Sequence, residues 1–428
     1  MIETMSWILA GWFAALMLGM PLYVSMGVAA LVFVFATGIT PSIVPQKIAQ
    51  AANSFPLLAA PLFILMGNIM NSGGITDRIF AFATACVGWL RGGLCHANIL
   101  ASVIFAGMSG SAVADAGGVG TLEIKAMKDE GYDAETAAAI TAASATIGPI
   151  IPPSLPMVIY GVSADVSIGG LFLAGVIPGL LMAGALMAMV SYIARKRGLP
   201  RHPFPGFRGL LRAYGRAHWA LMTPVILFGG MIAGIFTPTE AAGVATVYAL
   251  VLGLFVYREF DLRDLPRIAA ETVETTGVVL ALVMTASALG WCLSLSRIPQ
   301  TVGPQIVALV GEPLVFLLAV NLLLLVVGCF MEALAAMLIL IPILTPAAAQ
   351  FGIDPIQFGL VFVLNLMIGT ITPPVGVVLF VTSKIAGISF AAMSRAIVPW
   401  LLPLLGVLLA ITLWPPLTTW LPNLILGR

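Results

Sequence analysis

Two charge-free runs of equal length decide the fold. They are TAAAITAASATIGPIIPPSLPMVIYGVSA (136–164) and PIQFGLVFVLNLMIGTITPPVGVVLFVTS (355–383). Each run is long enough to cross the hydrocarbon core of a bilayer as a helix, which needs about 20 apolar residues. Each also contains two consecutive prolines near its centre, and proline removes a backbone donor and disfavours helix at the preceding residue. We therefore expect two spanning helices that break near the midplane; for either run alone, a proline kink that only shapes the helix is the alternative.

The rest of the chain has the same character. Of its 428 residues 60% are hydrophobic and 9% are charged, and the mean hydropathy is +1.09; a typical soluble domain has about 25% charged residues. This composition predicts an all-α polytopic membrane protein, because a spanning chain must satisfy its backbone hydrogen bonds internally. At about 20 residues plus a turn per crossing, the length allows roughly ten to twelve crossings. A soluble enzyme is excluded, and the net charge of +1 gives no indication of nucleic-acid binding.

The distribution of basic residues predicts which loops are cytoplasmic. Seven of the 19 Lys and Arg residues lie between Arg195 and Arg216, so the positive-inside rule places this loop inside. Counting crossings back from the loop puts both Arg91 and Lys125 inside, and the segment between them is then a re-entrant hairpin. The region 298–383 has no basic residue. We expect it to face outside and to send a second hairpin into the membrane through 313–349.

An internal repeat supports this arrangement. A shift of 221 positions pairs 107–178 with 328–399, and it matches Gly107 with Gly328, Asp133 with Asp354 and Pro178 with Pro399. Because the two copies start on opposite faces, the repeat is inverted, as is typical of secondary transporters. The expected organisation is scaffold helices in 1–90 and 219–297, half of a transport core in each of 91–194 and 298–428, and a basic cytoplasmic loop at 195–218.

Broken helices create small binding sites. The carbonyl end of one half-helix suits Na⁺ and the amide end of the other suits an anion. The hairpin tips are expected to supply further ligands through Gly107, Ser109 and Ser111 in the first and Gly328 in the second. Hydrogen bonding to their own helix is the alternative for the serines.

Four polar residues at membrane depth are further candidates. Asp115 and Glu332 are costly there unless they are paired or lie in a wet cavity, so each is either a ligand of substrate or proton or a partner of backbone amides. Ser144 and Asn365 are equivalent in the repeat and precede the glycine of each proline motif by four residues. We expect these two to support the ligands.

Enzyme motifs are absent or incomplete. The sequence GMSGS around Ser109 lacks the final glycine of GxSxG and has no plausible histidine partner. The cluster from Gly117 to Gly120 lacks the spacing and the lysine of a phosphate-binding loop. The four cysteines lack metal or redox spacing. We expect no enzymatic activity, no organic cofactor and no metal beyond Na⁺.

Five segments together resemble the large membrane subunit of the tripartite ATP-independent periplasmic (TRAP) transporters. They are SFPLLAAPLFILMGNIMNSGGI (54–75), GMSGSAVADAGGVG (107–120), GPIIPPS (148–154), TPTEAAG (237–243) and GTITPPVG (369–376). The resemblance covers nearly the whole chain. It implies an elevator-type, Na⁺-coupled importer of the ion transporter superfamily in the bacterial inner membrane.

The same resemblance implies two Na⁺ sites formed mostly by carbonyls. The first comprises Gly107, Ser109, Gly148, Ile151 and Pro153, and the second comprises Gly328, Gly369, Thr372 and Val375. Ile151 stands where the second repeat has Thr372, so any ligand at that position must be its backbone. Seven residues remain as candidates for substrate contact or ligand support: Ser111, Asp115, Ser144, Pro152, Glu332, Asn365 and Pro373.

The resemblance also implies partners. A small four-helix membrane subunit, expected as a separate polypeptide, would pack on the aromatic apolar spans near 5–36 and 219–257, which could otherwise face the lipid bilayer. A periplasmic substrate-binding protein would deliver a small organic acid over 298–311 and 350–355. The alternatives are a stand-alone Na⁺/dicarboxylate carrier, a channel or a non-transporting assembly subunit.

Overall fold

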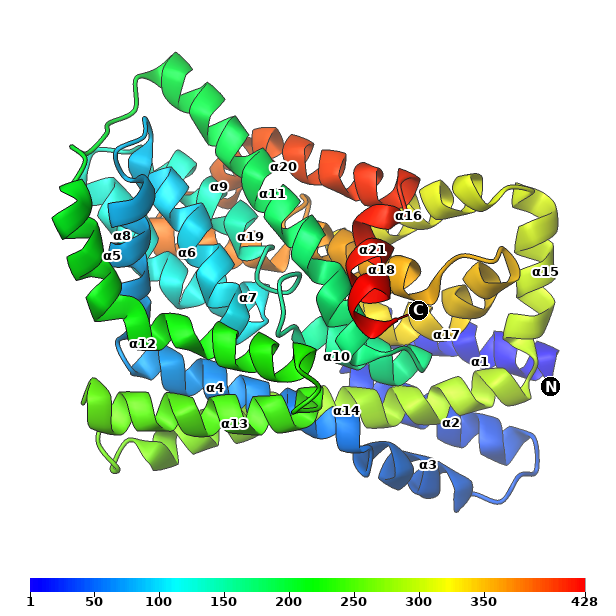
Figure 1. Ribbon diagram of the computed structural model, residues 1–428. Helices are drawn as coiled ribbons and strands as arrows, with labels where there is room; N and C mark the ends of the chain where they lie inside the picture. Colours follow the sequence, from blue (N-terminus) through cyan, green and yellow to red (C-terminus); the bar gives the residue numbers. More distant parts are fainter. Residues whose placement is uncertain (428) are drawn as a thin grey trace.

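The computed structural model describes residues 1–427. Seven of these residues are described by their backbone alone: Ser109, Pro299, Val302, Gly303, Ile306, Val307 and Leu309. Every regular element in this part of the chain is a helix (Figure 1). Seven helical segments are long and apolar enough to cross a membrane, which agrees with the predicted all-α polytopic class. They are Phe55–Ser72, Ile168–Arg197, Pro238–Tyr257, Leu265–Leu295, Pro313–Phe330, Ala333–Gln350 and Phe390–Leu413.

One layer of the molecule is formed by helices from the two predicted scaffold regions, along the lower side of Figure 1. Helix α13 packs on α4, and α14 packs on α2, α3 and α4. The elements are α1 (Ile2–Met17), α2 (Leu22–Ala36), α3 (Ile43–Ala52), the 3₁₀ turn η1 (Phe55–Leu58), α4 (Ala59–Ser72), α13 (Pro238–Val251), the π turn η2 (Leu252–Val256) and α14 (Leu265–Leu295).

The apolar run near 5–36 is two helices and not one long span. Helix α1 ends at Met17, and Gly19 adopts φ 89°, a left-handed value that suits glycine. Pro21 then precedes the first residue of α2. The chain turns back here because these two residues interrupt the helix.

Helix α12 (Gly206–Ile232) is bent at its middle, so that its first part runs beside α5 (Ile75–Val87) and the remainder lies along α13 (Figure 1). Two features cause the bend. Pro224 has no N–H for the carbonyl of Ala220. The Tyr257 hydroxyl also accepts from Ala220 N at 3.2 Å and donates to Arg216 O at 3.4 Å, two groups that pair with each other in an uninterrupted helix.

The remaining helices form two halves that follow the repeat. The first half contains α6 (Gly93–Ser109), α7 (Ala112–Gly117), α8 (Val119–Asp129), α9 (Ala134–Ala145), α10 (Leu155–Ala164) and α11 (Ile168–Arg197). The second contains α15 (Ile298–Val310), α16 (Pro313–Phe330), α17 (Ala333–Gln350), α18 (Pro355–Gly369), α19 (Val377–Ala386), α20 (Phe390–Leu413) and α21 (Pro416–Leu426). The paired residues Asp133 and Asp354 both cap helices, because their carboxylates accept from Thr136 N at 2.9 Å and Ile356 N at 2.8 Å.

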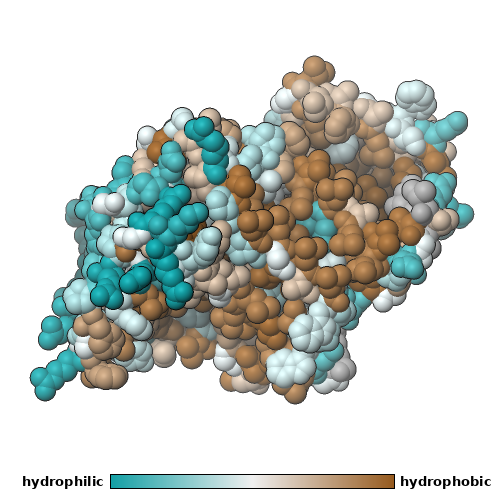
Figure 2. Space-filling model, turned by 90° about the horizontal axis from the view of Figure 1, so that it is seen from above, coloured by the Kyte–Doolittle hydropathy of each residue, from teal (hydrophilic) through white to brown (hydrophobic). Residues whose placement is uncertain are grey.

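The polar surface lies mainly at the ends of the molecule. Seen from above, hydrophilic residues gather at one end and recur at the other, and hydrophobic residues dominate between them (Figure 2). Helix α5 and the first part of α12 lie at one end, and α15 lies at the other (Figure 1). The start of α12, next to the basic loop, and α15 therefore lie at opposite ends of the molecule; which end faces the cytoplasm, and the membrane sides of the hairpins, stay predictions.

Candidate functional site

The first proline motif interrupts a helix as predicted. Helix α9 ends at Ala145 and α10 begins at Leu155, with turns and bends between them. Ser154 caps α10, because its hydroxyl accepts from Met157 N at 3.2 Å and donates to Pro149 O. All residues from Thr146 to Ser154 are buried, so this break is sealed inside the protein.

The second proline motif forms the equivalent break between α18 and α19. Helix α18 ends at Gly369, and α19 begins at Val377. Unlike the first break, this one is partly open, because Thr372 and Val375 are half-buried and Pro374 is exposed. The Pro152–Pro153 and Pro373–Pro374 bonds are both cis.

The tip of the first hairpin lies against the first break. Gly110 links α6 to α7 with φ 60°, and a Cβ atom there would lie 2.7 Å from Pro153 O. The next residue, Ser111, caps α7 by accepting from Ala114 N at 3.4 Å. Only a glycine allows the tip to approach the proline motif this closely.

The tip of the second hairpin lies against the second break. A Cβ atom on Gly369 would lie 2.7 Å from Gly328 Cα, so the two glycine backbones are in direct contact. Gly376 N also donates to Cys329 O at 3.2 Å. Glu332 caps α17 by accepting from Ala335 N at 3.0 Å, in the position that the repeat pairs with Ser111.

A cavity of about 50 Å³ joins the two tips and the two breaks. Ser111 and Glu332 both line it, together with Pro149 of the first break and Thr370 of the second. None of the described lining residues is Lys, Arg or His. The two halves of the repeat therefore line one small, partly open space, whose described walls include the exposed Glu332 carboxylate and no basic side chain.

The predicted residues of the first Na⁺ site are only partly brought together. Gly148 lies against Asp115, because a Cβ at Gly148 would collide with Asp115 Oδ2. The Ile151 side chain packs on Gly179 of α11, which leaves only its backbone for a ligand. Gly107 packs instead against Pro224 of α12, where its Cβ would lie 2.8 Å from the proline Cβ. The side chain of Ser109 lies outside the described residues; Pro152 and Pro153 are buried within the break.

Of the residues predicted for a second Na⁺ site, the structure brings Gly328 and Gly369 into contact and places Thr372 in the adjoining turn. The Thr372 hydroxyl donates to Ile368 O at 2.7 Å, and its oxygen lone pairs remain available to an ion. Val375 and Pro373 lie in the same half-buried loop.

Ser144 and Asn365 hold the two broken helices to the hairpins in parallel ways. Ser144 donates to Asn98 Oδ1 on α6 at 2.6 Å, and Asn365 donates to Asn321 Oδ1 on α16 at 2.9 Å. Each bond joins the half-helix before a break to the first arm of the hairpin that lies against it. The pair therefore has the geometry of supporting residues.

Sequence reasoning missed the partners in these networks. Asn98 also donates to Glu123 Oε2 at 2.6 Å and Thr141 Oγ1 at 2.8 Å, and Asn321 donates to Thr412 Oγ1 at 2.9 Å. Glu123 is a buried carboxylate, 1% exposed, on α8 in the second arm of the first hairpin. These residues stand out in the sequence only as isolated polar residues in apolar or small-residue segments. Nothing in the sequence indicates which of them form hydrogen bonds with each other.

Comparison with known proteins gives one consistent family. Residues 9–417 match the family described as "Tripartite ATP-independent periplasmic transporter, DctM component". The sialic acid TRAP transporter large permease protein SiaM of Vibrio cholerae is 47% identical over 418 residues, which cover 97% of this chain and 98% of that protein. The C4-dicarboxylate TRAP transporter large permease protein DctM of Pseudomonas aeruginosa is 42% identical, with 88% of each chain covered.

A solved structure has the same fold. The Alcanivorax borkumensis YdaH transporter matches with a TM-score of 0.62 and 15% identity over 87% of both chains. At this identity the likeness describes the fold alone. Together with the sequence matches over nearly the full chain, it shows that this chain belongs to the DctM component family of TRAP transporters, which are multi-pass inner-membrane permeases and not enzymes.

Proposed function

We propose that this chain is the large transport subunit of a tripartite system and imports a small organic acid by Na⁺-coupled, elevator-type movement of its hairpin core. The observation that carries this proposal is the cavity between the two tips, which adjoins both helix breaks and holds Glu332 without any basic side chain among its described lining residues. A carboxylate substrate near Glu332 needs positive charge beside it. Bound Na⁺ and the amide ends of α10 and α19 can supply that charge.

The two helix breaks offer groups that suit both Na⁺ and an anionic substrate. Carbonyls at the ends of α9 and α18 point towards the breaks and suit Na⁺, whereas the first amides of α10 and α19 suit an anion. The cavity of about 50 Å³ has room for no more than a few water molecules. The hairpin tips therefore have to separate before an organic acid can enter, and their closure would enclose it.

The relatives and this cavity together support a carboxylate as the substrate class. Sialic acid and C4-dicarboxylates, the solutes in the names of two relatives, both carry carboxylates. We propose that a periplasmic binding protein delivers such a solute and that a small membrane subunit completes the transporter.

A binding screen tests the substrate class. The proposed periplasmic binding protein is mixed with sialic acid, succinate, a neutral hexose and a neutral amino acid, and its Tm is measured. We expect stabilisation by one of the two carboxylates, because a ligand at 100 times its Kd adds about 2.7 kcal/mol to the free energy of unfolding. Stabilisation by the hexose alone would contradict a carboxylate substrate.

Replacing Thr372 by valine tests the second Na⁺ site. The change removes one oxygen beside the Gly328–Gly369 contact and keeps the side-chain shape. Loss of one buried polar contact costs about 1–3 kcal/mol, so the Na⁺ concentration for half-maximal stabilisation of the purified chain should rise roughly ten- to hundredfold. Ile151→Thr is the matched control, because that side chain faces α11, and its Na⁺ requirement should stay unchanged. Equal Na⁺ requirements for Thr372→Val and the wild type would show that this hydroxyl is not a Na⁺ ligand.

A further inference from the structure

A groove of about 840 Å³ lies among helices at the end of the molecule opposite α15 (Figure 1), and it shares no lining residue with the cavity at the hairpin tips. Its walls come from α5, from the first part of α12 and from the residues that follow α13. Tyr257, which lines it, is the last residue of the apolar span Pro238–Tyr257, and Arg258 and Glu259 come next. The basic loop 195–216 leads into α12, so the groove lies at the cytoplasmic interface.

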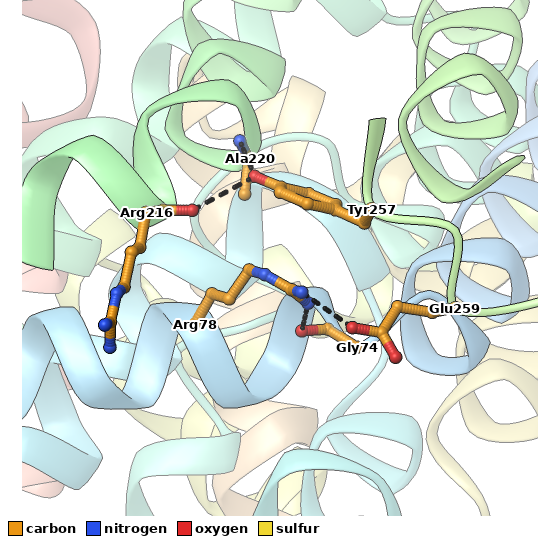
Figure 3. A network of polar contacts seen from close by, with 6 residues as sticks. All are labelled: Gly74, Arg78, Arg216, Ala220, Tyr257 and Glu259. Carbon is orange, nitrogen blue, oxygen red and sulfur yellow. Dashed lines mark hydrogen bonds and ion pairs between the residues drawn. The ribbon is translucent and has the colours of Figure 1, made fainter. Parts of the chain in front are cut away.

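One ion pair in the groove is already satisfied (Figure 3). Arg78 pairs with Glu259 at 2.6 Å and donates to Gly74 O at 2.7 Å. Its guanidinium also lies 4.2 Å from the ring centre of Tyr257, a cation–π distance. The charges of Arg78 and Glu259 therefore compensate each other and leave little charge for a ligand.

Two other arginines in the groove have a different environment. Arg212 and Arg216 lie four residues apart on α12, on the same helix face, and both are exposed. Among the described side chains neither has an ion-pair partner. In Figure 3 the Arg216 side chain extends away from the Arg78–Glu259 pair. Asp77 is the remaining acidic lining residue, so the groove retains a net positive charge.

Exposed apolar side chains lie beside these arginines in the groove. Trp219 of α12 is 50% exposed and Val256 of η2 is 45% exposed, and both line the groove. Basic and aromatic side chains together at a helix surface are typical of the bilayer interface, where headgroup and acyl chain meet. A free anion would engage the arginines alone, whereas a phospholipid also covers the apolar residues.

We propose that this groove binds an anionic phospholipid of the inner leaflet, of the phosphatidylglycerol class. The phosphodiester lies between the guanidinium groups of Arg212 and Arg216, which bind phosphate oxygens well because of their planar donor geometry. A headgroup hydroxyl can donate to Asp77, and the acyl chains lie along the exposed apolar residues Trp219 and Val256 of the groove. Basic pockets at the cytoplasmic ends of membrane helices commonly bind anionic lipid headgroups. Bound there, the lipid joins α12 to α5.

Lipid binding to the purified full chain tests this proposal. Phosphatidylglycerol or phosphatidylcholine is titrated into the protein in a phosphate-free detergent, and bound lipid is counted by native mass spectrometry. We expect selective retention of phosphatidylglycerol. In the double variant Arg212→Gln/Arg216→Gln, the apparent affinity for phosphatidylglycerol should fall about thirtyfold, because each interfacial arginine contributes roughly a fivefold gain in affinity.

The matched control removes two arginines outside the groove. Arg195 and Arg201 are exposed and belong to the same basic region, so Arg195→Gln/Arg201→Gln should bind phosphatidylglycerol within about threefold of the wild type. Millimolar inorganic phosphate should not displace the lipid. The proposal would be overturned if both double variants lost phosphatidylglycerol binding equally, if both lipids bound equally well, or if phosphate displaced the lipid. Size-exclusion profiles establish that each variant is folded.

Discussion

Replacing Gly369 by alanine is expected to abolish solute uptake. The added Cβ would lie 2.7 Å from Gly328 Cα and 2.8 Å from Gly328 C, and these are backbone atoms that no rotamer change can move. The tip of the second hairpin must then move away from the break between α18 and α19. Overpacking of this kind costs about 1–3 kcal/mol, and here it falls on the contact between two residues that we propose as Na⁺ ligands. A cost of up to about 3 kcal/mol corresponds to a fall in uptake of up to about a hundredfold, close to background.

Gly277→Ala is the matched control for this substitution. Gly277 lies in α14, and a Cβ there meets nothing within 4 Å. Uptake by the control should equal that of the wild type, and the amounts of both variants in the membrane are compared by immunoblot. If Gly369→Ala reached the membrane and transported as well as Gly277→Ala, the hairpin–break contact would have no part in transport.

The purified chain reconstituted alone is expected to accumulate no organic acid. An elevator needs an immobile frame, and the helices at the amino end carry large exposed aromatic side chains: Trp7 is 78% exposed, Phe13 60% and Phe35 66%. A groove of about 690 Å³ lies between α1 and α2, beside Trp7 and Trp12. The exposed apolar surface is larger than single scattered residues explain, and it is suited to a helix of the small subunit.

The assay for this prediction compares four preparations of liposomes under an inward Na⁺ gradient. They contain the chain alone, the chain with the small subunit, the chain with the loaded binding protein, and all three components. Only the complete set should accumulate solute. Accumulation by the chain alone would favour the stand-alone carrier.

The central architecture can be predicted from the sequence because local sequence features cause it. The paired prolines at 152–153 and 373–374 interrupt otherwise continuous apolar runs, and both breaks are found where the prolines lie. The repeat in turn predicts that each break has a hairpin beside it, and the backbone contact of Gly328 with Gly369 shows how closely one hairpin approaches.

Long-range side-chain contacts could not be predicted in the same way. The bond between Asn98 and Glu123 joins residues on two arms of a hairpin, and which polar residues meet there depends on helix rotation. The insertion of the Tyr257 hydroxyl into the backbone of α12 likewise depends on the packing of α13. Gly107 packs on Pro224 because the scaffold approaches α6, and no motif encodes that approach.

The most direct test of the central claim is the dependence of uptake on Na⁺ in liposomes that contain all three components. The labelled carboxylate chosen by the binding screen, sialic acid or succinate, is supplied with the binding protein outside. Accumulation is measured with Na⁺ outside only, with equal Na⁺ on both sides, and with K⁺ replacing Na⁺ throughout. We predict concentrative uptake only under the inward Na⁺ gradient, because in the proposed mechanism Na⁺ binding at two sites beside the tips is coupled to their closure. Equal concentrative uptake with K⁺ in place of Na⁺ would contradict the account.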